Sequence, residues 1–419
     1  MPSTELNRPI ERRVLVFSST FPSSVHLAHG VFVKERVRHV AQLPGYSLRV
    51  VSPVPWFPPL RRFKRWYPLS QIRRRETIDG LDVLHPRYPL LPKVGGAFHA
   101  ASMARAARST VARLRKDFPF DIIDAHFIFP DGVAAVHLAR RFHRPLVITA
   151  RGEDILRFPS LPIIGNQIRD ALRAASQLIA VSQEIAEKME REGADPAKIS
   201  VIPNGVDTDI FQPLSRDASR RQLNLPTDRP IVLSVGNRLE RKGFHLLVES
   251  LNAVRRRFPN ILAVIVGGPA RAGNDNTKLI QQRIQECGVS EYVRLVDERP
   301  SEELPLWYSA ADLFVLLTSR EGCPNVLMEA LACGLPAVAT RVGQIPQLLA
   351  NDRLGILLPE RSAAAGAQGI IEALDREWDR RLIRGVMEGH AWQRVSASID
   401  AVFDRALKTH RSRQATSQS

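Results

Sequence analysis

The feature that most constrains the fold is the stretch over residues 319–347, SREGCPNVLMEALACGLPAVATRVGQIPQ, and the apolar run before it. That run, AADLFVLLT over residues 310–318, is typical of a buried parallel strand. After a short loop, residues 325–333 predict a helix that ends at Gly334, and residues 335–340 predict the next strand. This order predicts a parallel α/β sheet with a ligand at the carboxyl end of the first strand.

Two glutamates lie in this stretch, Glu321 in the loop and Glu329 about one turn into the helix. The free N–H groups and partial positive charge at a helix start suit a phosphate. A carboxylate among such groups can accept hydrogen bonds from sugar hydroxyls. The spacing alone leaves a second interpretation open, in which Glu329 is an ordinary helix acid and Glu321 an ordinary loop residue.

The second half of the chain contains another strand, loop and helix. Residues 231–236 predict a strand, a basic loop with Arg238 and Lys242 follows, and a helix begins at Phe244. Cations between a strand and a helix start form a phosphate site by geometry and charge. The alternative is a surface loop with solvated cations. Gly268 ends a further strand, where a backbone can approach a ligand closely.

In the first half, strand 120–127 places His126 near its carboxyl end, where side chains of parallel strands point toward a ligand. The alternative is a packed histidine without a ligand. Gly30 precedes the predicted helix 31–43 and either lets the backbone approach a ligand or serves as a plain cap. Strand 145–150 is followed by Arg151, Gly152, Glu153 and Asp154.

Length and composition agree with two or three domains of a globular protein. The 419 residues are 44% hydrophobic and 24% charged. Cys287, Cys323 and Cys333 show no metal-ligand or CxxC spacing, which fits a reducing cytoplasm. We find no signal peptide and no run of the ~18 apolar residues needed to span a bilayer, so we expect a soluble or surface-attached protein.

The net charge of +16 requires an explanation, and residues 53–75 concentrate it. This segment interleaves aromatic and basic residues and contains no acid. Such a composition suits an anionic membrane interface, where each cation contributes on the order of 1 kcal/mol. The same composition could bind single-stranded nucleic acid by stacking, or the segment could be an extended, solvated insertion.

Glu321 and Glu329, eight positions apart within GCPNVLMEALACGLPAVAT, resemble the E-x7-E element of the retaining glycosyltransferases of family 4, the group 1 glycosyltransferases. The stretches DIIDAHFIFPDG and IPNGVDTDIFQP and the loop with Arg238 and Lys242 extend the resemblance over nearly the whole chain. It implies an α/β protein of the GT-B fold, with two Rossmann-like doubly wound parallel-sheet domains that face a cleft.

The resemblance also implies the domain organisation. We expect an N-terminal acceptor-binding domain over residues 1–212 and a nucleotide-sugar-binding domain over residues 213–390. A C-terminal helix at about residues 391–409 is expected to cross back onto the first domain, and residues 410–419 should be a disordered tail.

The resemblance implies transfer of a sugar from a nucleoside-diphosphate sugar, UDP- or GDP-linked, to an acceptor hydroxyl, with no cofactor and no metal. Glu321, His126, Arg238 and Lys242 are the expected catalytic residues. The expected acceptor-binding residues are His126, Arg151 and Asp154. Family members often have His-Gly where this chain has Arg151-Gly152, and an arginine offers a fork for an acidic or phosphorylated group. The expected donor-binding residues are Gly30, Arg238, Lys242, Gly268, Arg299, Glu321, Gly322, Cys323, Pro324, Asn325 and Glu329.

Many members of this family glycosylate lipid-linked acceptors. We therefore expect a saccharide or lipid-linked cell-envelope acceptor and no nucleic acid, and we place the protein in the cytoplasm, at the inner face of the membrane through the basic residues from Arg61 to Arg75. Two other hypotheses remain: a nucleotide-sugar epimerase or hydrolase of the same fold, and a non-catalytic basic protein that binds membranes or nucleic acid.

Overall fold

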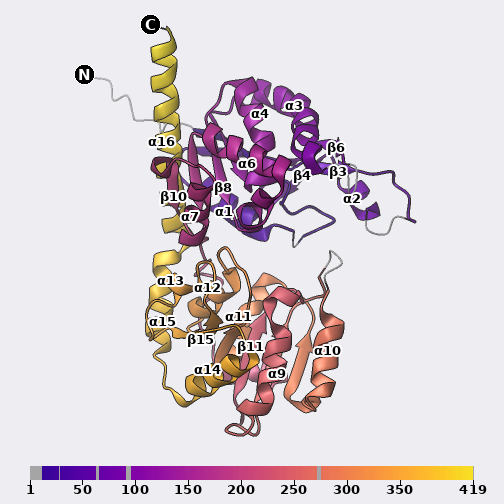
Figure 1. Ribbon diagram of the computed structural model, residues 1–419, viewed down its shortest axis with the longest axis vertical. Helices are drawn as coiled ribbons and strands as arrows, with labels where there is room; N and C mark the ends of the chain where they lie inside the picture. The colour runs from indigo at the N-terminus through magenta and orange to yellow at the C-terminus, as the bar shows by residue number, and fades with distance from the viewer. Residues whose placement is uncertain (1–11, 28, 63–65, 91–95, 271–274, 419) are drawn as a thin grey trace, which may run out of the picture. The chain divides into compact units, whose positions relative to one another are not determined.

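The computed structural model describes residues 12–27, 29–62, 66–90, 96–270 and 275–418 (Figure 1). The chain forms two compact units: unit 1 comprises Met1–Asn204 and Gln393–Ser419, and unit 2 comprises Gly205–Trp392. The predicted domain boundary at residues 212 and 213 therefore differs from the observed one. Residues 205–212 belong to unit 2 because Val206 pairs with Ala391 and the Phe211 ring packs against Tyr308.

Unit 1 is built on an eight-stranded sheet in which seven strands are parallel and β4 is antiparallel to β5. The central strands β1, β7, β8 and β9 are mostly buried and largely apolar, as expected where helices cover both faces, with Asp124 and His126 of β7 as polar exceptions. The strand order is β10 (Ile199–Val201), β9 (Gln177–Ala180), β8 (Leu146–Ala150), β7 (Ile122–His126), β1 (Arg12–Phe17), β2 (Tyr46–Val51), β5 (Leu81–Leu84) and β4 (Arg75–Ile78).

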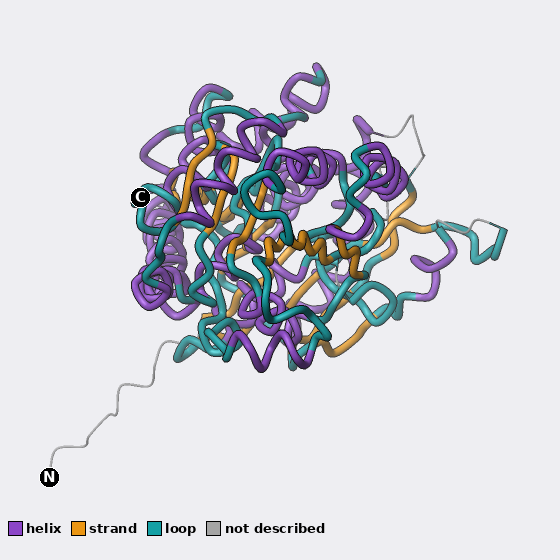
Figure 2. Tube along the Cα trace, turned by 90° about the horizontal axis from the view of Figure 1, so that it is seen from below, coloured by secondary structure: helices purple, strands orange, loops and turns teal. Residues whose placement is uncertain are grey.

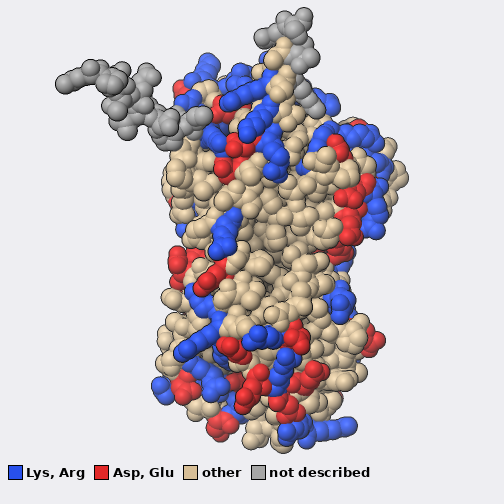
Figure 3. Space-filling model, turned by 90° about the vertical axis from the view of Figure 1, so that its left-hand side faces the viewer, with Lys and Arg blue, Asp and Glu red and all other residues tan. Residues whose placement is uncertain are grey.

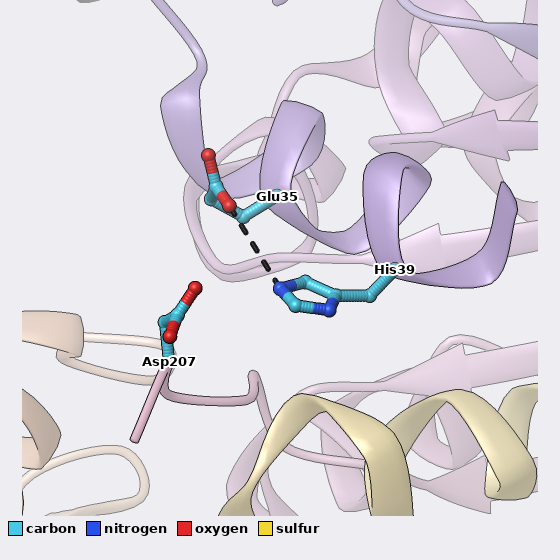
Figure 4. A group of neighbouring side chains, drawn as sticks. All are labelled: Glu35, His39 and Asp207. Atoms are coloured by element: carbon cyan, nitrogen blue, oxygen red, sulfur yellow. Dashed lines mark ion pairs between the residues drawn. The ribbon is translucent and has the colours of Figure 1, made fainter. Parts of the chain in front are cut away.

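The helices of unit 1 follow the strands in the expected alternation, since parallel neighbours need crossover connections. They include α1 (Val31–Ala41), α3 (His99–Asp117), α4 (Val133–Phe142), α5 (Glu153–Leu156), α6 (Pro162–Ala174) and α7 (Gln183–Arg191). On α1 the Glu35 carboxylate faces the His39 ring one turn away, with 3.9 Å between Oε2 and Nε2 (Figure 4). Asp207, also labelled there, belongs to unit 2.

The basic and aromatic segment contains structure that its composition does not predict. It holds the short strand β3 (Val54–Trp56), the helix α2 (Tyr67–Gln71) and the start of β4. β3 pairs with β6 (Arg87–Pro89) in a separate two-stranded sheet. In Figures 1 and 2 residues 57–62, the described part of the chain directly after β3, extend away from the body of unit 1.

Unit 2 contains a six-stranded parallel sheet in the order 3-2-1-4-5-6 of a Rossmann fold. The strands are β13 (Val293–Val296), β12 (Leu262–Val266), β11 (Ile231–Val235), β14 (Leu313–Leu316), β15 (Ala337–Thr340) and β16 (Gly355–Leu358). Its helices include α9 (Phe244–Val254), α10 (Thr277–Glu286), α11 (Leu304–Ala310), α12 (Asn325–Ala332) and α14 (Ala363–Asp375). A buried apolar cluster lies on each face of the sheet, which confirms the predicted doubly wound α/β fold.

The last helix, α16 (Trp392–Gln418), packs on unit 1 from Gln393 onward. Arg12 of β1 forms ion pairs with Asp400 and Asp404, and the Tyr46 ring contacts Phe403. The predicted disorder of residues 410–419 is wrong for residues 410–418, which continue this helix. In this part of α16, side chains one turn apart contact each other: Gln414 Nε2 lies 2.9 Å from His410 Nε2.

No helix in the part of the chain that the structure describes combines the length and the apolar character required to cross a membrane.

Candidate functional site

Two strand ends in unit 2 bring the predicted donor residues together. β11 leads into the loop of Lys242 and α9, and β14 leads into the loop of Glu321 and α12. Because β11 and β14 are parallel neighbours, both loops leave the same edge of the sheet. The Lys242 ammonium lies 2.7 Å from Glu321 Oε1.

Two further groups hold the same oxygen of Glu321. Arg241 Nη1 donates to Oε1 at 3.0 Å, and Thr318 Oγ1 donates at 3.1 Å. The Glu321 side chain is only 10% exposed. Burial opposes ionisation, yet Lys242 and Arg241 hold the pKa of Glu321 below its usual value. The loop therefore presents an ionised carboxylate in contact with two cations.

The backbone of both loops fits closely, and two glycines make this possible. Gly243 caps α9 with φ 75°, and a Cβ there would lie 2.0 Å from the Leu317 carbonyl oxygen. Gly343 has φ 58°, and a Cβ there would lie 2.2 Å from the carbonyl oxygen of Glu321. Glycine is required at both positions because L-residues rarely adopt this conformation and the space is filled by backbone.

Glu329 occupies the second turn of α12, as predicted. Tyr308 of α11, fully buried, donates a hydrogen bond to Glu329 Oε2 at 2.8 Å. Burial raises the pKa of Glu329 to about 7, although the Tyr308 hydrogen bond and the Lys242 charge oppose that rise. The carboxyl is thus poised to change its charge near neutral pH.

Arg238 follows β11 on the side of β12 and β13. Its guanidinium is almost buried and donates from Nη2 to the Val296 carbonyl at 3.1 Å and to Asp297 Oδ1 at 3.2 Å. Its backbone N–H donates to the Gly268 carbonyl at 2.9 Å, so Gly268 lies beside it. The structure thus places Arg238 and Gly268 together, and it places Lys242 with Glu321.

The remaining predicted donor residues lie in loops of unit 2. Arg299 is exposed in the loop after β13. Pro324 is the N-cap of α12, and Asn325 is its first residue. Gly322 is buried and its carbonyl accepts the Gln344 N–H at 2.9 Å, while Cys323 Sγ lies 3.5 Å from Met328 Sδ.

Unit 1 contains a buried polar cluster around the predicted acceptor residues. His126 ends β7, and its Nδ1 lies 2.9 Å from Arg151 Nη2. Its Nε2 lies 3.3 Å from Asp124 Oδ2. Arg151 also donates to Asn204 Oδ1 at 3.0 Å and lies 5.0 Å from the centre of the Phe32 ring. His126 and Arg151 are therefore direct partners.

Electrostatics fix the charge state of His126. Burial lowers the pKa of His126 to about 4, so the ring is neutral at physiological pH. A guanidinium can only donate, so Nδ1 accepts from Arg151 and the ring proton sits on Nε2, facing Asp124. Despite burial, His126 and Arg36 hold the pKa of Asp124 below its usual value.

Asp154 and Gly30 serve the backbone in this structure. Asp154 accepts from the N–H groups of Ile128 and Gly152, both at 2.8 Å, and from that of Arg151. Gly30 caps α1 with φ 73°, and a Cβ there would lie 2.4 Å from the Thr20 carbonyl oxygen. Both positions are thus explained by loop geometry, whether or not a ligand contacts them.

Sequence reasoning missed Arg241, Thr318 and Tyr308. Arg241 and Thr318 lie next to residues that the motifs singled out, so a search for donors around Glu321 could have proposed them. Tyr308 carries no local signal, since its bond to Glu329 depends on how α11 packs beside α12.

Two Rossmann-like units with mostly parallel sheets, one with paired acids and cations at the ends of its strands, are the architecture of the GT-B class of glycosyltransferases. The fold is similar to sucrose-phosphate synthase from Thermosynechococcus elongatus, with a TM-score of 0.72, 20% identity, and coverage of 98% of this chain and 100% of that one. Anabaena HepE in complex with UDP and glucose gives a TM-score of 0.68 at 18% identity, covering 94% and 99%.

The chain belongs to the group 1, or family 4, glycosyltransferases. The family model described as "Glycosyl transferases group 1" matches residues 215–384, and "Glycosyltransferase Family 4" matches residues 87–210. A D-inositol 3-phosphate glycosyltransferase from Arthrobacter sp. is 32% identical over 326 residues, 72% of this chain and 76% of that protein. The putative teichuronic acid biosynthesis glycosyltransferase TuaC of Bacillus subtilis is 29% identical over 398 residues, 93% and 95% of the two chains. The predicted family and fold are confirmed.

Proposed function

We propose that this glycosyltransferase moves a sugar from a UDP- or GDP-linked donor to a hydroxyl of a cell-envelope or lipid-linked glycan, with retention of the anomeric configuration and without a metal. The observation that carries the proposal is the contact of Lys242 and Arg241 with Glu321 at the strand ends of unit 2. Cations fixed at this edge suit a diphosphate, and the acid between them suits a sugar hydroxyl.

The difficult step is departure of the diphosphate, because negative charge grows on its oxygens as the glycosidic bond breaks. Arg238, Lys242 and the start of α12 would stabilise that charge. Such groups are effective because they are already fixed before the reaction begins. Arg238 is held by the Val296 carbonyl and Asp297, and Lys242 by Glu321, which supports this role.

The two acids would hold the sugars at either end of the donor. Glu321 would contact the transferred sugar together with the backbone of Gly322, Cys323, Pro324 and Asn325. Glu329 would accept hydrogen bonds from the ribose hydroxyls. Tyr308 donates to Oε2 of the Glu329 carboxylate, and the ribose hydroxyls would donate to Oε1. No protein nucleophile is included in this proposal.

An anionic acceptor fits the cluster in unit 1. Arg151 offers a planar fork and sits next to neutral His126, a combination suited to a carboxylate or a phosphate. The names of two relatives contain an acidic compound, teichuronic acid in one case and inositol 3-phosphate in the other, which supports an acidic acceptor. We place this chemistry at the cytoplasmic face of an anionic membrane, which the basic residues from Arg61 to Arg75 would contact.

Two measurements test the proposal. UDP-, GDP- and ADP-sugars are screened for protection of the full chain against thermal unfolding, since a bound donor raises apparent stability. The protecting donor is then incubated with and without a glycan acceptor bearing a carboxylate or phosphate. Transfer to the acceptor supports the proposal. Donor turnover that does not depend on any acceptor would instead favour the epimerase or hydrolase, and no protection by any donor would favour the non-catalytic protein.

A further inference from the structure

Several large exposed apolar side chains of unit 1 lie on elements that contact one another. Trp56 is 56% exposed, Phe98 74% and Ile163 61%, while Leu27, 74% exposed, is not part of this group. Leu60, 43% exposed, lies four positions after Trp56, and Leu161, 46% exposed, lies two positions before Ile163. Exposed aromatic and aliphatic side chains of this size are costly in water when they form a contiguous patch, and such patches mark interaction sites.

The contacts between their elements show that these side chains share one edge of unit 1. Trp56 pairs with Pro89 across the two-stranded sheet of β3 and β6. The Pro89 carbonyl accepts a 2.6 Å hydrogen bond from the Ser102 hydroxyl. Ser102 lies in the first turn of α3, and Phe98 is the N-cap of that helix. The strand pairing and this side-chain hydrogen bond thus join the Trp56 strand to the start of α3, next to Phe98.

The same edge continues to the start of α6. Gln167 Nε2 of α6 donates to the carbonyl of Ala97 at 2.8 Å, beside Phe98. The N-cap of this helix, Leu161, and its first two residues, Pro162 and Ile163, are consecutive, apolar and all exposed. None of these three side chains is buried in unit 1.

Cations surround this apolar edge. Arg61, Arg62, Arg73 and Arg74 are exposed in the segment that carries Trp56 and Leu60. Arg105 and Arg108 are exposed on the outer face of α3. The face over α16 is different, since Figure 3 shows Lys and Arg there mixed with Asp and Glu.

A groove of about 740 Å³ opens between α3, α4 and α6 beside the same edge. Its buried lining is apolar, with Ala100, Val133, Val136 and Ala171. Its exposed lining includes Arg140 and Arg173, the latter paired with Asp170 at 3.3 Å. A groove with a buried apolar lining and exposed arginines can bind an amphiphile with an anionic head group.

We propose that this edge of unit 1, formed by Trp56, Leu60, Phe98, Leu161, Ile163 and the arginines around them, docks on the headgroup layer of an anionic phospholipid membrane. Rings and aliphatic side chains bury at the interface while arginines meet the phosphates. The inference deepens the membrane part of the proposed function by naming the apolar anchors in β3, at the start of α3 and at the start of α6. It concerns unit 1 only, so its failure would leave the donor site in unit 2 unaffected.

The test is flotation of the full chain with vesicles of phosphatidylcholine, alone or mixed with phosphatidylglycerol. We expect binding to the mixed vesicles only, weakened when salt rises from about 0.1 M to about 1 M. Phe98→Ser with Ile163→Ser should weaken binding at least about tenfold, because each lost side chain removes a buried apolar contact. Arg61→Glu with Arg62→Glu should do the same by charge.

Matched controls lie elsewhere on unit 1. Val201→Ser changes an exposed apolar residue of β10, and Lys408→Glu changes an exposed cation of α16. Both should bind vesicles like the unmodified chain, and all variants should show the same thermal unfolding. The proposal is overturned if the unmodified chain does not float, if the four substitutions leave binding unchanged, or if single-stranded oligonucleotides bind at this edge and vesicles do not displace them.

Discussion

Lys242 Nζ and Glu321 Oε1 are 2.7 Å apart in unit 2, although the two residues belong to different strand-to-helix loops. The same oxygen also accepts from Arg241 and Thr318. Without a donor the acid therefore keeps the two cations in place. A diphosphate that enters would find these cations already oriented, which is the condition under which electrostatic stabilisation is most effective.

Replacing Lys242 tests whether its charge acts on the leaving group. We expect Lys242→Met to lower kcat/KM by about 10²- to 10³-fold, the usual effect of removing one preorganised group. Steady-state kinetics with the identified donor provide the measurement. Lys278→Met, an exposed lysine of α10, is the control and should leave kcat/KM unchanged. Equal losses in both variants would contradict a specific role.

The ion pair also predicts how stability depends on pH. Because the pKa of Glu321 in the folded chain is lowered, its contribution is complete above the usual value of about 4.3 and is lost as pH falls through the folded value. Glu321→Gln should therefore cost about 1–3 kcal/mol at pH 7 and little at low pH. Urea unfolding at several pH values measures this, with Glu291→Gln as an exposed control. A cost that does not change with pH would show that the ion pair is not its source.

Tyr308 should position Glu329 for the donor. In Tyr308→Phe the Glu329 carboxylate loses the hydrogen bond that Tyr308 donates at 2.8 Å. The pKa of Glu329, about 7 in the unmodified chain, should therefore rise. We expect the KM for the donor to rise about tenfold with little change in kcat, and the defect to shrink as pH increases to about 9. Tyr292→Phe in unit 2 is the control. A loss of kcat alone, independent of pH, would point to a structural effect instead.

Arg151 should act on the acceptor side. Removing it takes away the group that donates to His126 Nδ1 and to Asn204 Oδ1. We expect Arg151→Ala to raise the KM for an acidic acceptor about tenfold or more while donor binding stays the same. Arg151→Lys should restore little of the acceptor affinity. Lysine lacks the planar guanidinium fork with which Arg151 donates to both His126 and Asn204.

His126 adds a pH criterion to that experiment. Since the pKa of His126 is about 4, the ring stays neutral over the working range. The Arg151→Ala defect should therefore be constant from about pH 6 to pH 8, measured as the acceptor KM at each pH. A defect that follows the titration of a histidine near pH 6.5 would contradict the neutral ring.

The parts of unit 2 that local sequence determines could be predicted. β11 and α12 are largely apolar segments that stop just before Gly236 and Gly334, and β14 lies within the apolar run over residues 310–318. The pairing of Lys242 with Glu321 follows from the order of parallel strands, since both loops must leave one edge of the sheet.

The rest depends on tertiary packing. β4, β5 and β6 lie in or near the basic segment, where charged residues hide the strand pattern that partner strands then impose. The bond between Tyr308 and Glu329 joins two helices 21 positions apart in sequence and follows from no motif. Residues 410–418 have a polar composition that resembles a tail, yet they extend a helix whose earlier turns pack on unit 1.

The central claim is that unit 2 binds a nucleoside diphosphate through Arg238 and Lys242, and calorimetric titration tests it most directly. UDP and GDP are titrated into the full chain in the presence of EDTA. The account predicts binding of at least one nucleotide without metal, weakened at least about thirtyfold in a chain with Arg238→Ala and Lys242→Met, and unchanged in one with Arg256→Ala and Lys278→Met. Binding that is absent under EDTA, or that survives the loss of both Arg238 and Lys242, would contradict it.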